Sequence, residues 1–191
     1  MPELELPDSG WQVLNSQVVF QGWLTVARDR LLKPDGDQMD YTYIASSDAA
    51  AVLAFTDAGQ VVLTRQYRHP LRRVILDLPA GGVRARETPE QAARRELAEE
   101  TGFTARDMRL LGRFFPVPGM MGHSVHVFCA RDIEHGDAAP DEHEIIDLVL
   151  IDWADLLRQV ESGEATDVTV AYAVLLYAAQ SQTANPALFI P

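Results

Sequence analysis

The segment from Gly81 to Phe103 constrains the fold of this 191-residue chain more than any other. Thr88 can cap a helix, Pro89 suits the first helical turn, and Gln91 completes a capping box with Thr88. Gly102 can end the same helix, because glycine adopts the left-handed conformation that helix ends often need. We therefore expect a helix from Thr88 to Gly102 that follows a glycine-containing turn.

Three carboxylates crowd onto this predicted helix, at Glu96, Glu99 and Glu100. Positions three and four apart share a face, so these side chains should lie together and repel one another. A divalent cation relieves such repulsion, and Mg²⁺ prefers oxygen ligands and often bridges to phosphates. Taken alone, however, such a run is more often a solvated face with ion pairs such as Arg95 with Glu99.

The residues around the helix favour the metal site over the solvated face. They fit the pattern Gly-x5-Glu-x7-Arg-Glu-U-x-Glu-Glu-x-Gly-U, in which U is apolar. The matching residues are Gly81, Glu87, Arg95, Glu96, Leu97, Glu99, Glu100, Gly102 and Phe103. This ungapped match resembles the Nudix box, and the chain is identified by it as a member of the Nudix hydrolase family.

The resemblance implies a magnesium site, with Mn²⁺ as the alternative ion. The residues expected to form it are Ala80 through its carbonyl, Glu96, Glu99 and Glu100, with Glu99 also a catalytic candidate. Glu87 is expected to orient Arg95 and the helix from behind these ligands. A metal bound there would polarise phosphoryl oxygens and activate a water molecule.

The chain also resembles the ADP-ribose pyrophosphatase branch of the family, from about Val19 to Tyr177. The segments that carry this resemblance are Leu32–Gly36, Arg65–Arg68, Leu78–Gly82 and Pro118. It implies hydrolysis of the diphosphate in a nucleoside diphosphate linked to another group. The first candidate substrate is ADP-ribose, which would give AMP and ribose 5-phosphate.

The same resemblance points to substrate-binding residues outside the box. Arg68 is expected to bind the diphosphate through its forked donors, the alternative being a surface ion pair. Trp23 is expected either to stack on a base or ribose or to lie in the core. Gly119, Met120 and His123 belong to a loop expected to contact the substrate. The branch often has glutamate where His123 stands, so a nucleotide sugar or another ADP conjugate is the alternative substrate.

The loop from Asp137 to Glu144 is polar and acidic. In the branch, a glutamate of this loop acts as catalytic base or closes on the metals, and Glu142 and Glu144 both qualify. A mobile loop can bring such a base to the water when substrate binds. The alternative is an ordinary solvated loop.

The fold expected from these patterns is α+β, a Nudix fold with a mixed β-sheet sandwiched between α-helices and with N-terminal antiparallel strands. The expected strands are Val18–Val26, Tyr41–Ala45, Ala51–Phe55, Gln60–Arg68, Val74–Leu78, Met108–Phe115, Ser124–Ala130 and Ile145–Ile151. Two further helices are expected, from Asp152 to Val160 and from Asp167 to Gln180. Residues 1–45 would form an N-terminal strand region that pairs with a second subunit in a homodimer, and 46–191 the Nudix hydrolase domain.

Composition excludes several other classes of protein. A formal charge of −12 disfavours nucleic acid as a partner, because an acidic surface repels phosphate backbones. The single cysteine, Cys129, allows neither an internal disulfide nor a zinc pair. No signal peptide and no apolar run of about 18 residues is visible, so we expect a cytoplasmic protein without membrane contact.

Three other functions compete within the family. A nucleoside triphosphatase is disfavoured by Pro118 and the N-terminal strands, and a decapping role by the acidic charge. A metabolite sensor that does not cleave its ligand would commonly lack box glutamates, all of which are present here. The group beyond the diphosphate, the number of metals and the phosphorus attacked stay open.

Overall fold

The structure is a computed structural model of the chain. It describes residues 9–136, 138, 145–165 and 167–183. The chain divides into two compact units. Unit 1 comprises Met1–Ser46 and Val117–His123, and unit 2 comprises Ser47–Pro116 and Ser124–Pro191.

Unit 1 contains a three-stranded antiparallel sheet, formed by β1 (Gln12–Gln21), β2 (Thr25–Leu32) and β3 (Gln38–Ala45). The single strand expected in Val18–Val26 is wrong, because the chain turns at residues 22–24 and continues as a hairpin. Gly36 makes the β2–β3 turn with φ of 90°, a value that glycine adopts without strain. β1 is exposed along its whole length.

Unit 2 is built around a seven-stranded sheet. Its strands are β4 (Ala49–Phe55), β5 (Gln60–Arg68), β6 (Arg73–Asp77), β7 (Ala80–Gly82), β8 (Phe103–Phe114), β9 (Val125–His135) and β10 (Ile146–Asp152). The main order is β10-β5-β4-β9-β8, with β6 paired to β5 and β7 paired to β4. β4 and β9 run parallel and the other pairs are antiparallel, so the sheet is mixed as predicted. A short 3₁₀ turn, η1 (His69–Leu71), joins β5 to β6.

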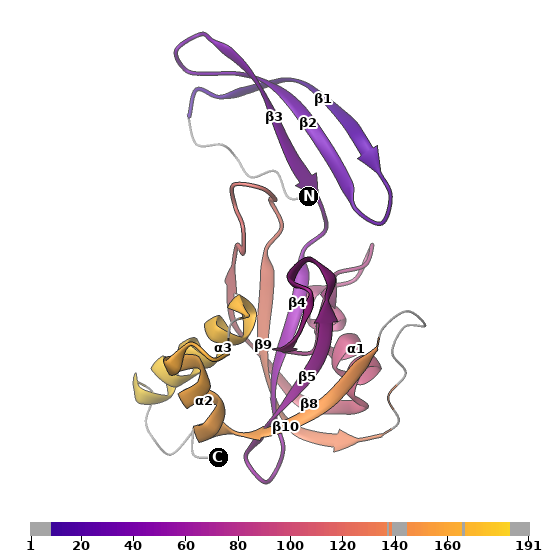
Figure 1. Cartoon of the computed structure of the whole chain (residues 1–191), viewed down its shortest axis with the longest axis vertical. Helices are drawn as coiled ribbons and strands as arrows, with labels where there is room; N and C mark the ends of the chain where they lie inside the picture. Colours follow the sequence, from indigo (N-terminus) through magenta and orange to yellow (C-terminus); the bar gives the residue numbers. More distant parts are fainter. Residues whose placement is uncertain (1–8, 137, 139–144, 166, 184–191) are drawn as a thin grey trace. The chain divides into compact units, whose positions relative to one another are not determined.

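Helices cover both faces of this sheet (Figure 1). α1 (Pro89–Thr101) lies on one face, and α2 (Trp153–Ser162) and α3 (Val168–Thr183) lie on the other. β4 shows the division, because its side chains alternate between the faces. Val52 packs in the cluster of α1, and Leu53 packs in the cluster of α2 and α3; both are fully buried. The predicted α+β sandwich is confirmed.

Besides the β1–β2 hairpin, the largest differences from the prediction are at β7, β8 and β9. β9 runs to His135, beyond the expected end at Ala130. β8 begins at Phe103 rather than at Met108, because Gly102 reverses the chain with φ of 74° and the next residues pair at once with the end of β9. β7 was not expected, since two of its three residues are glycines and carry no strand pattern. Among the described residues, no helix is both long and apolar enough to cross a bilayer.

Candidate active site

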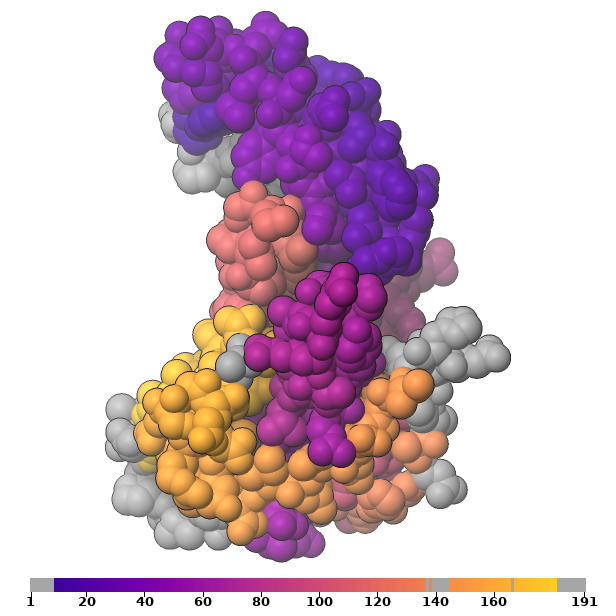
Figure 2. Space-filling view, viewed as in Figure 1, coloured from indigo at the N-terminus to yellow at the C-terminus, as the bar shows by residue number. Residues whose placement is uncertain are grey.

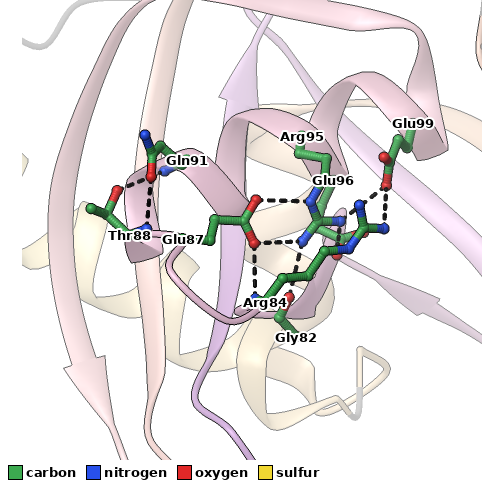
Figure 3. A network of polar contacts seen from close by, with 8 residues as sticks. All are labelled: Gly82, Arg84, Glu87, Thr88, Gln91, Arg95, Glu96 and Glu99. Atoms are coloured by element: carbon green, nitrogen blue, oxygen red, sulfur yellow. Dashed lines mark hydrogen bonds and ion pairs between the residues drawn. The ribbon is translucent and has the colours of Figure 1, made fainter.

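Helix α1 begins and ends as its sequence predicts. The backbone N–H of Gln91 donates to Thr88 Oγ1 at 3.2 Å, and the N–H of Thr88 donates to Gln91 Oε1 at 2.8 Å (Figure 3). Gly102 donates its N–H to the Ala98 carbonyl at 2.9 Å and ends the helix. Ala93 and Leu97 are fully buried against the sheet. The helix is therefore fixed at both ends and along one face, which holds its carboxylates in place.

The acidic side chains of α1 meet strand β7. Glu96 is 9% exposed and Glu100 is 8% exposed, low values for carboxylates. The backbone N–H of Ala80 donates to Glu100 Oε2 at 3.2 Å. The structure thus places Glu96 and Glu100 against β7, while Glu99 is connected to Glu96 through Arg95. We call Glu87, Glu96, Glu99 and Glu100 the carboxylate cluster.

Gly81 makes room for the carboxylate of Glu96. A Cβ atom built on Gly81 would lie 2.0 Å from Glu96 Oε1 and 2.3 Å from its Cδ atom. Such distances are far inside van der Waals contact, so no larger residue fits without moving Glu96. The first glycine of the box therefore leaves the space that the Glu96 carboxylate occupies, and a larger residue there would displace this carboxylate.

Arg95 ties the loop after β7 to the helix. Its Nε and Nη2 atoms donate to the two Glu87 carboxylate oxygens at 2.9 and 3.0 Å, as the predicted pairing requires. Nη2 also donates to the Gly82 carbonyl at 3.0 Å, while Nη1 donates to Glu96 Oε1 at 2.6 Å and to Glu99 Oε2 at 3.0 Å. All three guanidinium nitrogens are thus engaged in a side chain only 16% exposed. Arg95 therefore has a structural role, because it connects the loop after β7 to helix α1.

These contacts shift the pKa values of both partners. The hydrogen bonds from Arg95 lower the pKa of Glu87 from 4.5 to about 2, and the Arg84 backbone N–H contributes at 2.9 Å. The same hydrogen bonds raise the pKa of Arg95 above its usual value. Glu87 is therefore ionised at any pH at which the protein is expected to work.

A pH prediction follows from the depressed pKa of Glu87. Its stabilisation should be complete above pH 4.5 and should disappear as the pH falls to about 2. The free energy of unfolding of the wild type should therefore fall more steeply over this range than that of Glu87→Gln. Urea unfolding at a series of pH values measures the difference, with Glu90→Gln on the same helix as the control. Parallel curves for wild type and Glu87→Gln would contradict it.

The carboxylate cluster has the chemistry of a divalent-metal site. It carries four formal negative charges, and three of its carboxylates, those of Glu87, Glu96 and Glu99, form ion pairs with Arg84 or Arg95. The donor set is all oxygen, which suits a hard dication such as Mg²⁺. Among the described residues, no group of three or more His, Cys, Asp or Glu side chains is already arranged to hold a metal ion. Instead, Arg95 lies between Glu96 and Glu99 in this arrangement.

Arg68 lies on β5 and pairs with the neighbouring strand. Its Nη2 atom donates to Asp77 Oδ2 at 2.5 Å, and the Asp77 side chain is only 8% exposed. Burial raises the pKa of Asp77, the nearby Asp167 adds to this, and Arg68 opposes both. The β5–β6 hairpin forms part of the surface of unit 2 (Figure 2, magenta), and the Arg68 side chain is 43% exposed. Its partner here is thus Asp77 rather than a residue of the carboxylate cluster.

The remaining predicted site residues lie in unit 1 or outside the described chain. Trp23 is 93% exposed, so the core alternative for it is wrong. Met120 is 56% exposed, and the Gly119 carbonyl accepts a hydrogen bond from a tyrosine hydroxyl at 2.7 Å. His123 Nδ1 lies 3.1 Å from Ser46 Oγ. The two loop glutamates, Glu142 and Glu144, lie outside the described residues.

Comparison with known proteins decides the family. The family model described as the NUDIX domain matches residues 45–171, well over half of the chain. The chain belongs to the Nudix family. Hydrolases of this family generally depend on a divalent metal ion.

Individual Nudix relatives agree with this assignment. An ADP-ribose pyrophosphatase of Bacillus subtilis (strain 168) is 37% identical over 74% of this chain and 77% of its own length. A methanol dehydrogenase activator of Bacillus methanolicus is 28% identical over 85% of this chain and 90% of its own. A crystal structure of an ADP compounds hydrolase has a TM-score of 0.78 at 22% identity, covering 91% of this chain and 95% of that one. The predicted Nudix fold and the likeness to the ADP-ribose pyrophosphatase branch are confirmed.

Proposed function

We propose that this Nudix protein hydrolyses the diphosphate of a nucleoside diphosphate linked to another group, with Mg²⁺ as its metal and ADP-ribose as the first substrate. The observation that carries the proposal is the pair of buried carboxylates against β7, Glu96 beside Gly81 and Glu100 beside Ala80. The likeness to an ADP-ribose pyrophosphatase supports the substrate class. In the reaction, water adds to one phosphorus and the anhydride P–O bond breaks, giving AMP and ribose 5-phosphate.

Each residue of the site has a separate role in this proposal. Glu96, Glu100 and the Ala80 carbonyl would hold the metal, with Glu99 as a further ligand or catalytic residue. A divalent ion there would neutralise phosphoryl charge and lower the pKa of a water molecule. Glu87 and Arg95 keep the loop against the helix, and preorganised groups of this kind need not rearrange during the reaction. Arg68 would bind the diphosphate with the guanidinium nitrogens that do not face Asp77.

A nucleotide sugar is the second candidate substrate, and His123 is the reason. The side chain at this position is an imidazole near Ser46 rather than the carboxylate that the ADP-ribose branch often has. A carboxylate accepts hydrogen bonds from sugar hydroxyls, whereas an imidazole offers one donor and one acceptor when neutral. The group beyond the diphosphate can therefore differ from ribose 5-phosphate.

A substrate panel scored by product identity tests the proposed function. ADP-ribose, an ADP-hexose, a UDP-hexose, a dinucleoside diphosphate and a nucleoside triphosphate would be incubated with and without Mg²⁺. We expect ADP-ribose, the ADP-hexose and the UDP-hexose each to give a nucleoside monophosphate and a sugar phosphate. No substrate should turn over in EDTA. Release of pyrophosphate from the triphosphate alone would contradict the proposal. Tight binding without turnover would favour a sensor.

The catalytic base is proposed to be Glu142 or Glu144. Separate Glu142→Gln and Glu144→Gln variants should identify it, because loss of a positioned base typically lowers kcat by about 10² to 10⁴-fold. One variant is expected to lose this much activity and the other much less, with KM nearly unchanged in both. Full activity in both variants would show that neither loop glutamate is the catalytic base.

We also propose that the protein is a homodimer and that it is located in the cytoplasm. The exposed apolar side chains of strand β1 and its turn support a homodimer through residues 1–45. They are Val13, Leu14, Val18, Val19, Phe20 and Trp23. Such a patch on an edge strand is a typical protein–protein contact surface. A cytoplasmic location rests on the single cysteine, which suits a reducing compartment.

A further inference from the structure

Arg84 lies in the loop between β7 and α1, and it is held next to the carboxylate cluster by its backbone. Its N–H donates to Glu87 Oε2 at 2.9 Å, and Glu87 is itself fixed by the two hydrogen bonds from Arg95. The loop position of Arg84 is therefore as well fixed as the Glu87–Arg95 pair. Its Cα atom is anchored at the site, while its long side chain is not.

The side chain of Arg84 extends from this anchor toward Glu99 (Figure 3). Its Nη2 atom lies 3.5 Å from Glu99 Oε2, the same oxygen that Arg95 Nη1 reaches at 3.0 Å. A distance of 3.5 Å is at the outer limit of a hydrogen bond, and two guanidiniums that share one oxygen repel each other. The contact therefore stabilises the loop very little, especially since the Arg84 side chain is 56% exposed.

The two arginines of the site thus differ in what they can still bind. Arg95 is nearly buried and uses all three of its guanidinium nitrogens on protein acceptors. For the Arg84 guanidinium, Glu99 is the one acceptor found within the part of the chain that the structure describes. Arg84 therefore keeps most of its donors for a ligand, in a planar fork that matches two phosphate oxygens.

We propose that Arg84 binds phosphate oxygens of the substrate diphosphate beside the carboxylate cluster, and so sets the affinity for diphosphate substrates. The inference rests on the proposed function, since it takes the ligand of the cluster to be a diphosphate. An exposed cation is needed there because the chain as a whole carries a charge of −12, which opposes the approach of an anionic substrate.

The test compares Arg84→Gln with Arg86→Gln. Arg86 lies two residues away in the same exposed loop, and the structure shows no ion pair for it among the described residues. Both variants lose the same charge. Four quantities are measured for each. KM and kcat are determined for ADP-ribose by steady-state kinetics, and calorimetry gives Kd for the nonhydrolysable α,β-methylene ADP and Kd for Mg²⁺ without nucleotide.

Arg84→Gln is expected to raise KM and the analogue Kd by about ten-fold, the usual effect of losing one charge-assisted contact. Its kcat and Mg²⁺ affinity should stay within about three-fold of the wild type, and Arg86→Gln should match the wild type throughout. The KM and analogue Kd of Arg84→Lys should lie between those of the wild type and Arg84→Gln, because lysine keeps the charge but lacks the planar fork of donors.

Three results would overturn the assignment of Arg84. The first is an unchanged KM and analogue Kd in Arg84→Gln. The second is a rise of KM and analogue Kd in Arg86→Gln as large as in Arg84→Gln. The third is a ten-fold weaker Mg²⁺ affinity of Arg84→Gln, which would mean that Arg84 acts through the carboxylate cluster. In each case wild-type turnover of ADP-ribose would leave the proposed function standing. A wild type that neither binds the analogue nor hydrolyses any diphosphate would remove both.

Discussion

Replacing Glu100 with glutamine should lower metal-dependent turnover by about a thousand-fold while the fold stays intact. The charge of this buried carboxylate is proposed to hold the metal, whose charge stabilisation amounts to several kcal/mol, and about 1.4 kcal/mol corresponds to a factor of ten in rate. Glutamine has the same shape, and its carbonyl oxygen can still accept the hydrogen bond from the Ala80 N–H. Steady-state kinetics with ADP-ribose and thermal unfolding measure the two effects.

The matched control for Glu100→Gln is Glu90→Gln. Glu90 lies at the start of the same helix and pairs with Arg94 at 2.9 Å on the exposed side. Its replacement removes the same charge from α1 without touching the cluster, so kcat should change by less than about two-fold, as expected for a surface ion pair. If Glu100→Gln keeps wild-type turnover and wild-type Mg²⁺ affinity, the metal assignment is wrong.

Alanine at position 81 should abolish most activity, because its Cβ atom would lie 2.0 Å from Glu96 Oε1. Either β7 or the Glu96 carboxylate must then move by more than about 1 Å, and a displacement of that size can lower the rate about 100-fold. We therefore expect at least that loss in kcat, together with weaker Mg²⁺ binding. Kinetics and calorimetry on Gly81→Ala measure both.

Gly82→Ala is the control for this packing effect. Among the described residues, a Cβ atom on Gly82 would meet Ser47 Oγ alone, at 3.6 Å, which is an ordinary contact. Its carbonyl, which accepts from Arg95, is unchanged by the substitution. The loss in kcat should therefore be at least about ten times smaller than for Gly81→Ala. An equal loss of kcat in Gly81→Ala and Gly82→Ala would show that both glycines are needed for loop flexibility rather than for the fit around Glu96.

The sequence predicted the parts of the site that depend on local order. The capping box of Thr88 and Gln91, the helix end at Gly102 and the shared face of the glutamates all follow from spacings of three and four residues. Short-range chemistry of this kind does not depend on the rest of the fold, so α1 appears where it was expected. The Glu87–Arg95 pairing was expected from the resemblance alone.

The features that the sequence did not predict all depend on contacts between elements. Gly81 meets Glu96 only because β7 pairs with β4 under the helix, and β7 has no strand pattern of its own. Arg68 pairs with Asp77 although the β5–β6 register places Arg73 opposite Arg68 and Thr64 opposite Asp77, so residue spacing alone does not indicate this ion pair. Arg84 occupies a position of the box where any residue is allowed, so the pattern gave no signal for it.

The most direct test of this account is a crystal structure with Mg²⁺ and α,β-methylene ADP-ribose. We expect a metal ion bound by the carboxylates of Glu96 and Glu100, in contact with the diphosphate of the analogue. Glu87 and Arg95 should remain paired as they are in the present structure. An ion bound elsewhere, with both glutamates turned away from it, would contradict the account.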